Sequence, residues 1–393
     1  MEIAIDYASA VWQGAGIGRY TRALTRELLR LDHENRYTLL FPAGLPGRPA
    51  PFLGHLEKLR EIRPDVRLRP LPLTDRYLAI FWQRLRVPLP VEALCGWVDL
   101  FFSPDFVLPP QRRGRRMVTI HDLAFLVYPE CAVPRMTWYL HGAVSRAAAR
   151  ADLVLAGSQS CREDILRFLR LPPERVVVLY SGVESYYQPL DDVARLAEVR
   201  ARYALPERFL LTVGTIEPRK NLPRLFQALA SLPERVRLPL LVAGKPGWLY
   251  EETFAAVERL GLHHWVRFLG FVPDEDMVGL YNLALGVVYP SLYEGFGVPP
   301  LEGLACGTPV LTSNVSAMPE VVGDAAILVD PKDPASIADG LRRLIEDEEL
   351  RRALRAAGPE RARLFTWERA GRQLFDIVRR LLHRDRSSAS PEG

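Results

Sequence analysis

The sequence has 393 residues, of which 48% are apolar and 25% are charged. This is the composition of a globular protein, and the length favours two domains because a single core seldom grows that large. The net charge is +4, and residues 1–200 carry 27 Lys and Arg against 22 Asp and Glu. That surplus is too small to indicate nucleic acid binding, but it would suit contact with an anionic surface or a lipid phosphate.

The four cysteines lie far apart, with no CxxC pair and no histidine spacing that would hold zinc: Cys95, Cys131, Cys161 and Cys306. This spacing predicts free thiols in a reducing cytosol. The first residues read as a strand and lack the features of a signal peptide. No segment approaches the length of a membrane-spanning helix. We therefore expect a cytoplasmic protein.

Strand and helix patterns alternate along the N-terminal half. Met1 to Asp6 predicts a strand, and Trp12 to Leu31 predicts a glycine-rich loop leading into an amphipathic helix. The spacing of Gly14, Gly16 and Gly18 is not that of a dinucleotide-binding GxGxxG loop. The alternation predicts a mostly parallel sheet, with further strands at Tyr37–Phe41, Val66–Pro72, Leu100–Pro104, Met117–Asp122, Leu153–Ser158 and Val176–Gly182.

Three stretches of this half leave alternatives open. Tyr77–Pro90 is aromatic and basic, so it could be a membrane-surface helix, but we favour a core helix whose arginines reach the solvent. Gln111–Arg116 is read as a solvated loop in preference to a lipid site. His121 and Asp122 end a strand at its carboxyl end, where open α/β sheets bind ligands, although a lone histidine is more often structural.

A second domain is expected to begin after a polar helix at Leu190–Arg202. Phe209–Leu229 then reads as strand, loop and helix, with Arg219 and Lys220 adjacent in the loop and Asn221 placed to cap the helix. Two cations at a helix start oppose the positive end of the helix dipole. They therefore indicate an anionic ligand such as a diphosphate, the alternative being a surface loop exposed by chance.

The stretch Tyr289–Ser313 holds more candidate ligand-binding groups than any other stretch of its length, and its pattern predicts a strand, a loop, a helix and a second strand. Pro299 suits the first turn of a helix that would end near Cys306, with Gly307 as a left-handed cap. Helix N-termini at the carboxyl ends of strands bind anions. We therefore predict a phosphate site formed by three consecutive backbone amides, those of Phe296, Gly297 and Val298.

Two glutamates, Glu294 and Glu302, are expected to flank this phosphate site without entering it. Carboxylates so placed accept hydrogen bonds from hydroxyl groups, which predicts a sugar beside one and a ribose beside the other. The alternative is an ordinary turn with two solvated glutamates.

The segment YEGFGVPPLEGLACGTPV, which contains both glutamates, closely resembles the signature of retaining GT-B glycosyltransferases of family 4, a group of bacterial mannosyl- and glucosyltransferases. The resemblance extends to Val315–Pro334 and Val213–Leu229, and it is weaker over the rest of the chain. It implies an α/β chain of GT-B fold, with two Rossmann-like domains facing a central cleft. Residues 1–195 would bind the acceptor and residues 205–365 the donor, and a helix at about 366–384 would pack back on the first domain.

The resemblance also implies roles for individual residues. Gly16 would approach the donor diphosphate, His121 would lie near the transferred sugar, and the Val272 backbone would contact the nucleotide base. Many relatives carry an arginine where this chain has Thr215, so no role is carried over there. The expected catalytic residues are His121, Arg219, Lys220 and Glu294, and the remaining donor-binding residues are Gly16, Val272, Phe296, Gly297, Val298 and Glu302.

The implied reaction is retaining transfer of a hexose, mannose in the first instance, from a nucleotide-diphosphate sugar to a glycan or polyprenyl-linked acceptor. No Asp-x-Asp is expected in either cleft-facing loop, so cations and backbone amides would balance the diphosphate charge without a metal or other cofactor. No carboxylate is convincingly placed as a nucleophile, which favours front-face departure over double displacement. Peripheral contact with the inner face of the membrane, through the first domain, is also expected.

Several alternatives remain at this point. The donor could be UDP-glucose, with GDP-mannose the first choice. A non-catalytic module that binds nucleotide sugars would carry the same motifs. A nicotinamide-dependent enzyme would need a GxGxxG loop that the N-terminal region lacks, and a GT-B phosphorylase would need pyridoxal phosphate.

Overall fold

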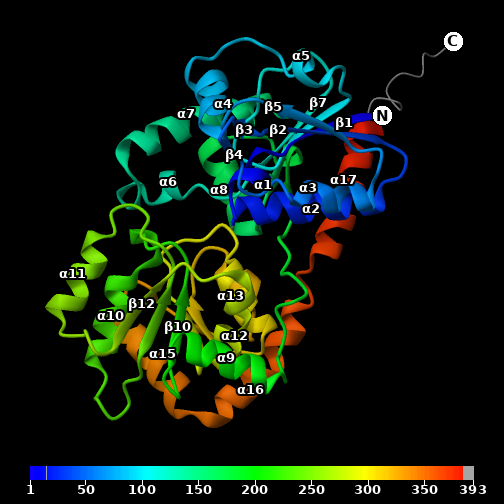
Figure 1. Ribbon diagram of the computed structural model, residues 1–393. Helices are drawn as coiled ribbons and strands as arrows, with labels where there is room; N and C mark the ends of the chain where they lie inside the picture. The colour runs from blue at the N-terminus through cyan, green and yellow to red at the C-terminus, as the bar shows by residue number, and fades with distance from the viewer. Residues whose placement is uncertain (15, 384–393) are drawn as a thin grey trace. The chain divides into compact units, whose positions relative to one another are not determined.

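The computed structural model describes residues 1–14 and 16–383, and the chain divides into two compact units. The first comprises Met1–Leu123, Tyr139–Gly182 and the chain from Trp367 onward. The second comprises Ala124–Trp138 and Val183–Thr366. Each unit is a parallel sheet covered by helices (Figure 1). The predicted α/β architecture with two Rossmann-like domains is therefore confirmed.

The first unit is built on a seven-stranded sheet in the order β5-β2-β1-β6-β7-β8-β9, with every neighbouring pair parallel. Parallel neighbours need crossover connections, which helices provide. The strands are β1 (Glu2–Asp6), β2 (Arg36–Pro42), β5 (Arg67–Leu71), β6 (Leu100–Ser103), β7 (Arg115–Ile120), β8 (Leu153–Ala156) and β9 (Val176–Val178), beside a small hairpin of β3 (Gly44–Leu45) and β4 (Arg48–Pro49). The helices are α1 (Ala8–Trp12), α2 (Ile17–Leu31), α3 (His55–Ile62), α4 (Asp75–Ala79), α5 (Glu92–Cys95), most of α7 (Pro134–Arg150), α8 (Gln159–Leu169) and α17 (Trp367–His383), with a 3-10 turn at Pro173–Arg175.

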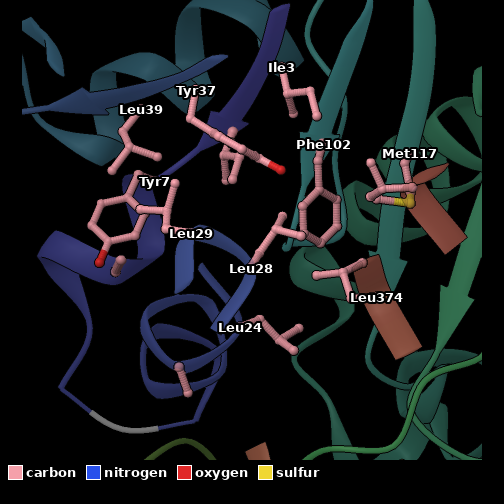
Figure 2. Packing of buried hydrophobic residues seen from close by; sticks show 14 of the residues in the cluster. Ile3, Tyr7, Leu24, Leu28, Leu29, Tyr37, Leu39, Phe102, Met117 and Leu374 are labelled. Atoms are coloured by element: carbon pink, nitrogen blue, oxygen red, sulfur yellow. The ribbon is translucent and has the colours of Figure 1, made fainter. Parts of the chain in front are cut away.

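The core of the first unit joins segments from both ends of the chain. Helix α17, red in Figure 1, packs along α2. Leu28 of α2 and Leu374 of α17 gather with Phe102 of β6 in one buried cluster (Figure 2). The helices approach closely at Gly371, where an added Cβ would lie 2.4 Å from the Cβ of Glu27. The apolar face predicted for the C-terminal helix is thus buried, and residue 384, included in that prediction, lies outside the described residues.

The second unit is built on a six-stranded sheet in the order β12-β11-β10-β13-β14-β15, also entirely parallel. Its strands are β10 (Leu210–Val213), β11 (Leu240–Ala243), β12 (Val266–Gly270), β13 (Gly286–Tyr289), β14 (Val310–Ser313) and β15 (Ile327–Val329). Its helices are α6 (Ala124–Val127), α9 (Val193–Arg202), α10 (Leu222–Ser231), α11 (Glu251–Arg259), α12 (Asp274–Leu283), α13 (Val298–Ala305), α14 (Met318–Val322), α15 (Pro334–Glu346) and α16 (Glu348–Ala362), with 3-10 turns at Pro129–Cys131 and Pro218–Lys220. The apolar runs that the sequence predicts to be strands lie buried at the centre of this sheet.

The second unit also holds the connecting helix α9. Arg202 and Tyr203 donate hydrogen bonds to the carboxylate of Asp276 in α12, at 2.6 and 2.8 Å. The short segment Ala124–Trp138 falls in this unit as well, where Trp248 donates to the carbonyl oxygen of Cys131 at 2.8 Å.

The expected helix over Tyr77–Pro90 is shorter than predicted. α4 continues only into one π-helical turn, η1 (Ile80–Arg84). It ends because Arg86 adopts φ 52°, outside the helical region, and prolines at 88 and 90 cannot continue a helix. Trp82 is buried as expected of a core helix, but Leu85 is 68% exposed. Neither of the two alternatives for this stretch is therefore fully correct.

Within residues 1–14 and 16–383, no helix is long and apolar enough to cross a bilayer. All four cysteines are buried free thiols.

Candidate active site

The strand order of the second unit reverses between β10 and β13, because the chain moves to one side of β10 first and to the other side later. Loops that follow the strands at such a reversal diverge and leave a crevice, which is where open α/β sheets bind ligands. Here the two loops are residues 214–221 and 290–297. They are tied together by a hydrogen bond from the Leu292 amide to the Arg219 carbonyl oxygen at 2.9 Å.

Two glycines shape the first of these loops. Gly214, with φ 134°, lies directly after β10 and occupies a conformation that side chains rarely adopt. Gly244 follows the neighbouring strand β11, and a Cβ there would lie 1.8 Å from the Gly214 carbonyl oxygen. The backbones after β10 and β11 can therefore approach this closely only because residue 244 has no side chain.

Glu294 lies at the centre of a charged cluster in this crevice. Its carboxylate pairs with Arg219 at 2.8 Å and with Lys220 at 2.7 Å. The Tyr289 hydroxyl, at the end of β13, donates to the same carboxylate at 2.9 Å. Glu294 therefore contacts both cations directly, and its expected place beside the phosphate site, next to a sugar, stays a prediction.

Burial and charge oppose each other in this cluster. Burial would raise the pKa of Glu294, but Arg219 and Lys220 outweigh it and lower that pKa to about 2. Burial lowers the pKa of Lys220, against the attraction of Glu294. Burial also raises the pKa of Glu217, which the two cations only partly offset. Glu294 is therefore ionised at neutral pH, and a further anion would have to compete with it for the cations.

Arg219 is held in a fixed orientation by groups from both loops. It donates to the Tyr293 carbonyl oxygen at 2.8 Å and to the Glu217 carboxylate at 2.5 Å. Asn221 is the N-cap residue of α10, as predicted, but its side chain makes no cap hydrogen bond, because Asn221 adopts φ 61° and its side-chain amide donates elsewhere. That amide bonds the carbonyl oxygens of Pro290 and Pro331, at 2.9 and 2.7 Å, and so fixes the loop to the strands β13 and β15.

The helix predicted after the second loop is present as α13, which has eight residues. Gly297 immediately precedes it with φ 101°, and an added Cβ would lie 2.0 Å from the terminal methyl carbon of Met318. Phe296 is buried against Phe365 in an edge-to-face contact, whereas Val298 is partly exposed at the first helical position. The three predicted amides thus follow directly on the loop that carries Glu294.

The two remaining donor residues of this unit occupy different places. Glu302 is buried within α13 and accepts a hydrogen bond from the Tyr281 hydroxyl at 2.8 Å. Val272 is buried in the loop after β12, two strands away from β10. Glu302 is therefore held by another helix, and its expected contact with a ribose stays a prediction.

In the first unit, Gly16 and His121 lie in loops at the carboxyl ends of β1 and β7. Gly16 is exposed at the start of α2 with φ 56°, and no atom lies within 4 Å of where its Cβ would be. The ring of His121 lies edge-on to Tyr20 and Phe106, with centroids 4.7 and 5.4 Å apart. Its Nε2 is 2.8 Å from the Pro104 carbonyl oxygen, which can only accept, so this nitrogen carries a proton.

Sequence reasoning missed two carboxyl groups here: Asp105, whose charge acts on His121, and Asp6, which interacts with Asp105. Asp6 ends β1 and Asp105 follows β6, the two strands between which the order of this sheet reverses. Burial raises the pKa of Asp105 and lowers that of His121, while their mutual attraction opposes both shifts. Applying the carboxyl-end rule to every predicted strand would have identified both, since Asp6 is the last residue of one predicted strand and Asp105 directly follows another.

Asp6 is expected to make stability depend on pH. Burial, opposed by a hydrogen bond from the Ala8 amide, raises its pKa from 3.8 to about 7. Between these values the folded state binds more protons than the unfolded state, so the free energy of unfolding falls as pH rises. Asp6→Asn removes this titration and should be more stable than wild type at about pH 8, by a few kcal/mol at most, with the gain vanishing near pH 4.

Thermal unfolding midpoints across this pH range test the prediction. Glu61→Gln, which removes a charge from the exposed side of α3, is the matched control and should behave like wild type. A gain for Asp6→Asn that is the same at every pH would show that the carboxyl group does not titrate in this window.

Asp-x-Asp does occur once, at Asp274 to Asp276, at the start of α12. Asp276 is already engaged by Arg202 and Tyr203. Among residues 1–14 and 16–383, no three His, Cys, Asp or Glu side chains are grouped so that they could hold a metal ion.

Comparisons with known proteins agree with this geometry. Residues 14–185 match the family described as Glycosyltransferase Family 4, and residues 197–361 match Glycosyl transferases group 1. The O-antigen chain mannosyltransferase B of Escherichia coli is 36% identical over 285 residues, which cover 72% of this chain and 74% of the relative. The chain therefore belongs to the family 4 glycosyltransferases. It is an enzyme of the hexosyltransferase class.

Solved structures show the same fold. Sucrose-phosphate synthase from Thermosynechococcus elongatus has a TM-score of 0.75 at 22% identity, covering 97% of this chain and 99% of that chain. Anabaena HepE in complex with UDP and glucose has a TM-score of 0.71 at 18% identity, covering 96% and 99%. This chain thus has the predicted GT-B fold.

Proposed function

We propose that this enzyme transfers mannose, with retention of configuration, from a nucleotide-diphosphate sugar to a glycan or polyprenyl-linked acceptor. The observation that carries the proposal is the pair of cations, Arg219 and Lys220, at the switch point of the second unit. They are adjacent to the loop that leads into α13, whose first amides form the second half of an anion site. The two cations and these backbone amides together would suit a diphosphate.

The relatives support mannose and leave the nucleotide open. The E. coli relative is named as a mannosyltransferase of the O-antigen chain, which favours mannose and makes GDP-mannose the first donor to test. HepE was solved with UDP and glucose, so UDP-glucose is the alternative donor.

In the proposed mechanism, Arg219, Lys220 and the amides of Phe296, Gly297 and Val298 hold the diphosphate and stabilise its charge as it departs. This arrangement would need no metal. Glu294 is a weak base and nucleophile, because two cations hold its pKa near 2. Double displacement through Glu294 is therefore disfavoured, and the departing diphosphate would take the acceptor proton from the same face.

The remaining residues would position the donor. Glu302 would accept from the ribose hydroxyls, and the Val272 backbone would contact the base. In the first unit, Gly16 would leave room for the diphosphate, and His121 would contact the transferred sugar with an imidazole that burial favours in its neutral form. The basic surplus of residues 1–200 supports work at the inner face of the membrane as a peripheral protein.

Ligand binding to the folded state tests the donor assignment, because it raises the unfolding temperature. GDP should raise it more than UDP, and a chelator should not change either shift. Incubation with GDP-mannose should release GDP, and the anomeric proton signal of the product should show retention. Equal shifts for both nucleotides would contradict the preference for guanine, and binding without turnover would favour a non-catalytic module.

Lys220→Ala should weaken binding of GDP by roughly 10- to 100-fold, because one charge-assisted contact to phosphate is lost. Lys58→Ala is the control, since Lys58 is an exposed lysine on α3 of the first unit, to which no donor contact is assigned. Calorimetry on both variants measures the difference. Unchanged affinity in Lys220→Ala would remove this lysine from the diphosphate site.

A further inference from the structure

The first unit contains a pocket lined by four arginines. Its volume is about 400 Å³, and it lies between the chain after η1, the chain before and at the start of β7, and helix α7. The arginines are Arg86, Arg116, Arg146 and Arg150, and no Asp or Glu is among the lining residues. The rest of the wall is mostly apolar, with Trp82, Pro88 and Leu108 among its members.

Few groups of the protein compensate the positive charge of these four arginines. Arg116 donates to the Gln111 carbonyl oxygen at 3.0 Å. Within residues 1–14 and 16–383, none of the four forms an ion pair with a carboxylate. Burial, together with the charges of Arg86 and Arg150, lowers the pKa of Arg146. Like charges that converge on one pocket repel each other, so a bound anion would stabilise the arrangement.

An apolar groove of about 330 Å³ adjoins this pocket. Trp82 lines both, so the two hollows are neighbours. Leu85 and Tyr77 of the groove are 68% and 55% exposed, which is unusual for large apolar side chains that neighbour each other. The other lining residues are also apolar: Leu71, Leu73, Leu78, Ile80, Phe81, Leu89 and Leu94.

We propose that the arginine pocket and the apolar groove together bind a lipid phosphate, with its phosphate group on Arg86, Arg116, Arg146 and Arg150 and its hydrocarbon chain in the groove. Charge complementarity selects the headgroup, because arginine binds phosphate oxygens with paired donors. The exposed apolar side chains favour a ligand with a hydrocarbon chain, in preference to a free phosphate ion. The proposal deepens the proposed function, on which it rests, by giving the lipid-linked acceptor a binding site.

The backbone at Arg86 offers a discriminating variant. Arg86 has φ 52°, which is strained for any residue with a side chain and is readily adopted by glycine. Arg86→Gly should therefore fold at least as well as wild type while it removes one guanidinium group from the pocket. Loss of binding in this variant cannot then be attributed to loss of folding.

Calorimetry with farnesyl phosphate, farnesol and inorganic phosphate, on the full chain, tests the proposal. Farnesyl phosphate should bind wild type, and both Arg146→Gln and Arg86→Gly should weaken it by roughly 10- to 100-fold. Arg112→Gln, which removes an exposed arginine outside the pocket, should bind like wild type. Leu85→Ser should weaken farnesyl phosphate and leave the response to inorganic phosphate unchanged.

Two results would overturn the proposal. One is equal affinity of farnesyl phosphate for wild type, Arg146→Gln and Arg86→Gly. The other is inorganic phosphate binding as tightly as farnesyl phosphate, which would make the pocket a site for free anions. The GDP shift of the same preparations separates this test from the proposed function. A protein that binds GDP and not the lipid phosphate contradicts the lipid site alone, and a protein that binds the lipid phosphate and not GDP contradicts the GDP-mannose donor alone.

Discussion

Glu294→Gln is expected to lower sugar transfer by roughly 100- to 1,000-fold while nucleotide diphosphate stabilises the variant more than it stabilises wild type. The Glu294 carboxylate pairs with Arg219 and Lys220 at 2.8 and 2.7 Å, and Glu217 also pairs with Arg219 at 2.5 Å. Glutamine keeps the shape but not the charge, so the two cations repel each other until a diphosphate binds. Breaking a buried pair in this way costs about 3–5 kcal/mol in the empty protein.

Three measurements on one preparation examine this: the unfolding midpoint without ligand, its shift with GDP, and the rate of transfer. Glu252→Gln is a suitable control, because Glu252 pairs with Arg259 on the exposed side of α11, with its side chain 61% exposed. If GDP stabilised Glu294→Gln less than it stabilises wild type, the carboxylate would be a partner of the nucleotide and not its competitor.

Gly244→Ala is expected to have the largest effect on stability, with a loss on the order of 4 kcal/mol or more. The new Cβ would lie 1.8 Å from the Gly214 carbonyl oxygen, and neither backbone can move without breaking hydrogen bonds at the ends of the strands. The Gly214 amide bonds the Ala243 carbonyl oxygen at 2.9 Å, and the Gly244 amide bonds that of Gly270 at 2.8 Å. Displacing Gly214 would also displace the loop that carries Arg219 and Lys220.

Gly261→Ala separates this clash from ordinary backbone strain. Gly261 also lies in the second unit, with φ 64°, but a Cβ there meets nothing within 4 Å. It should cost only about 1 kcal/mol. Urea unfolding of both variants measures the difference. Equal losses would show that the strands can separate enough to admit a methyl group.

The fold could be predicted from the sequence because its signals are local. Leu240–Ala243 and Gly286–Tyr289 are short, mostly apolar runs of the length that buried parallel strands have, and each is followed at once by Gly or Pro. The helix over Tyr77–Pro90 could not be predicted in the same way, since its end depends on the conformation of Arg86.

Only part of the candidate active site could be predicted from the sequence, for a different reason. Arg219 and Lys220 were recognised because two cations at a helix start are locally unfavourable. Their contact with Glu294, 74 positions later in the case of Lys220, depends on β10 and β13 being neighbours in the sheet. That adjacency is a property of the strand order, which no local pattern encodes. The side-chain contacts of Asn221 could not be predicted for the same reason, because the accepting carbonyl groups of Pro290 and Pro331 lie just after the distant strands β13 and β15.

The packing of α17 against α2 has a consequence for biosynthesis. The buried cluster of the first unit includes Trp367, Leu374 and Leu381, which follow the whole second unit in sequence. As the chain leaves the ribosome, α2 and the first sheet emerge long before their final helix does. The second unit, which has no such late segment, can complete its core first. The earlier-synthesised half of this enzyme is therefore the later one to finish folding, and until then the face of α2 that α17 covers is open to chaperones and to misassembly.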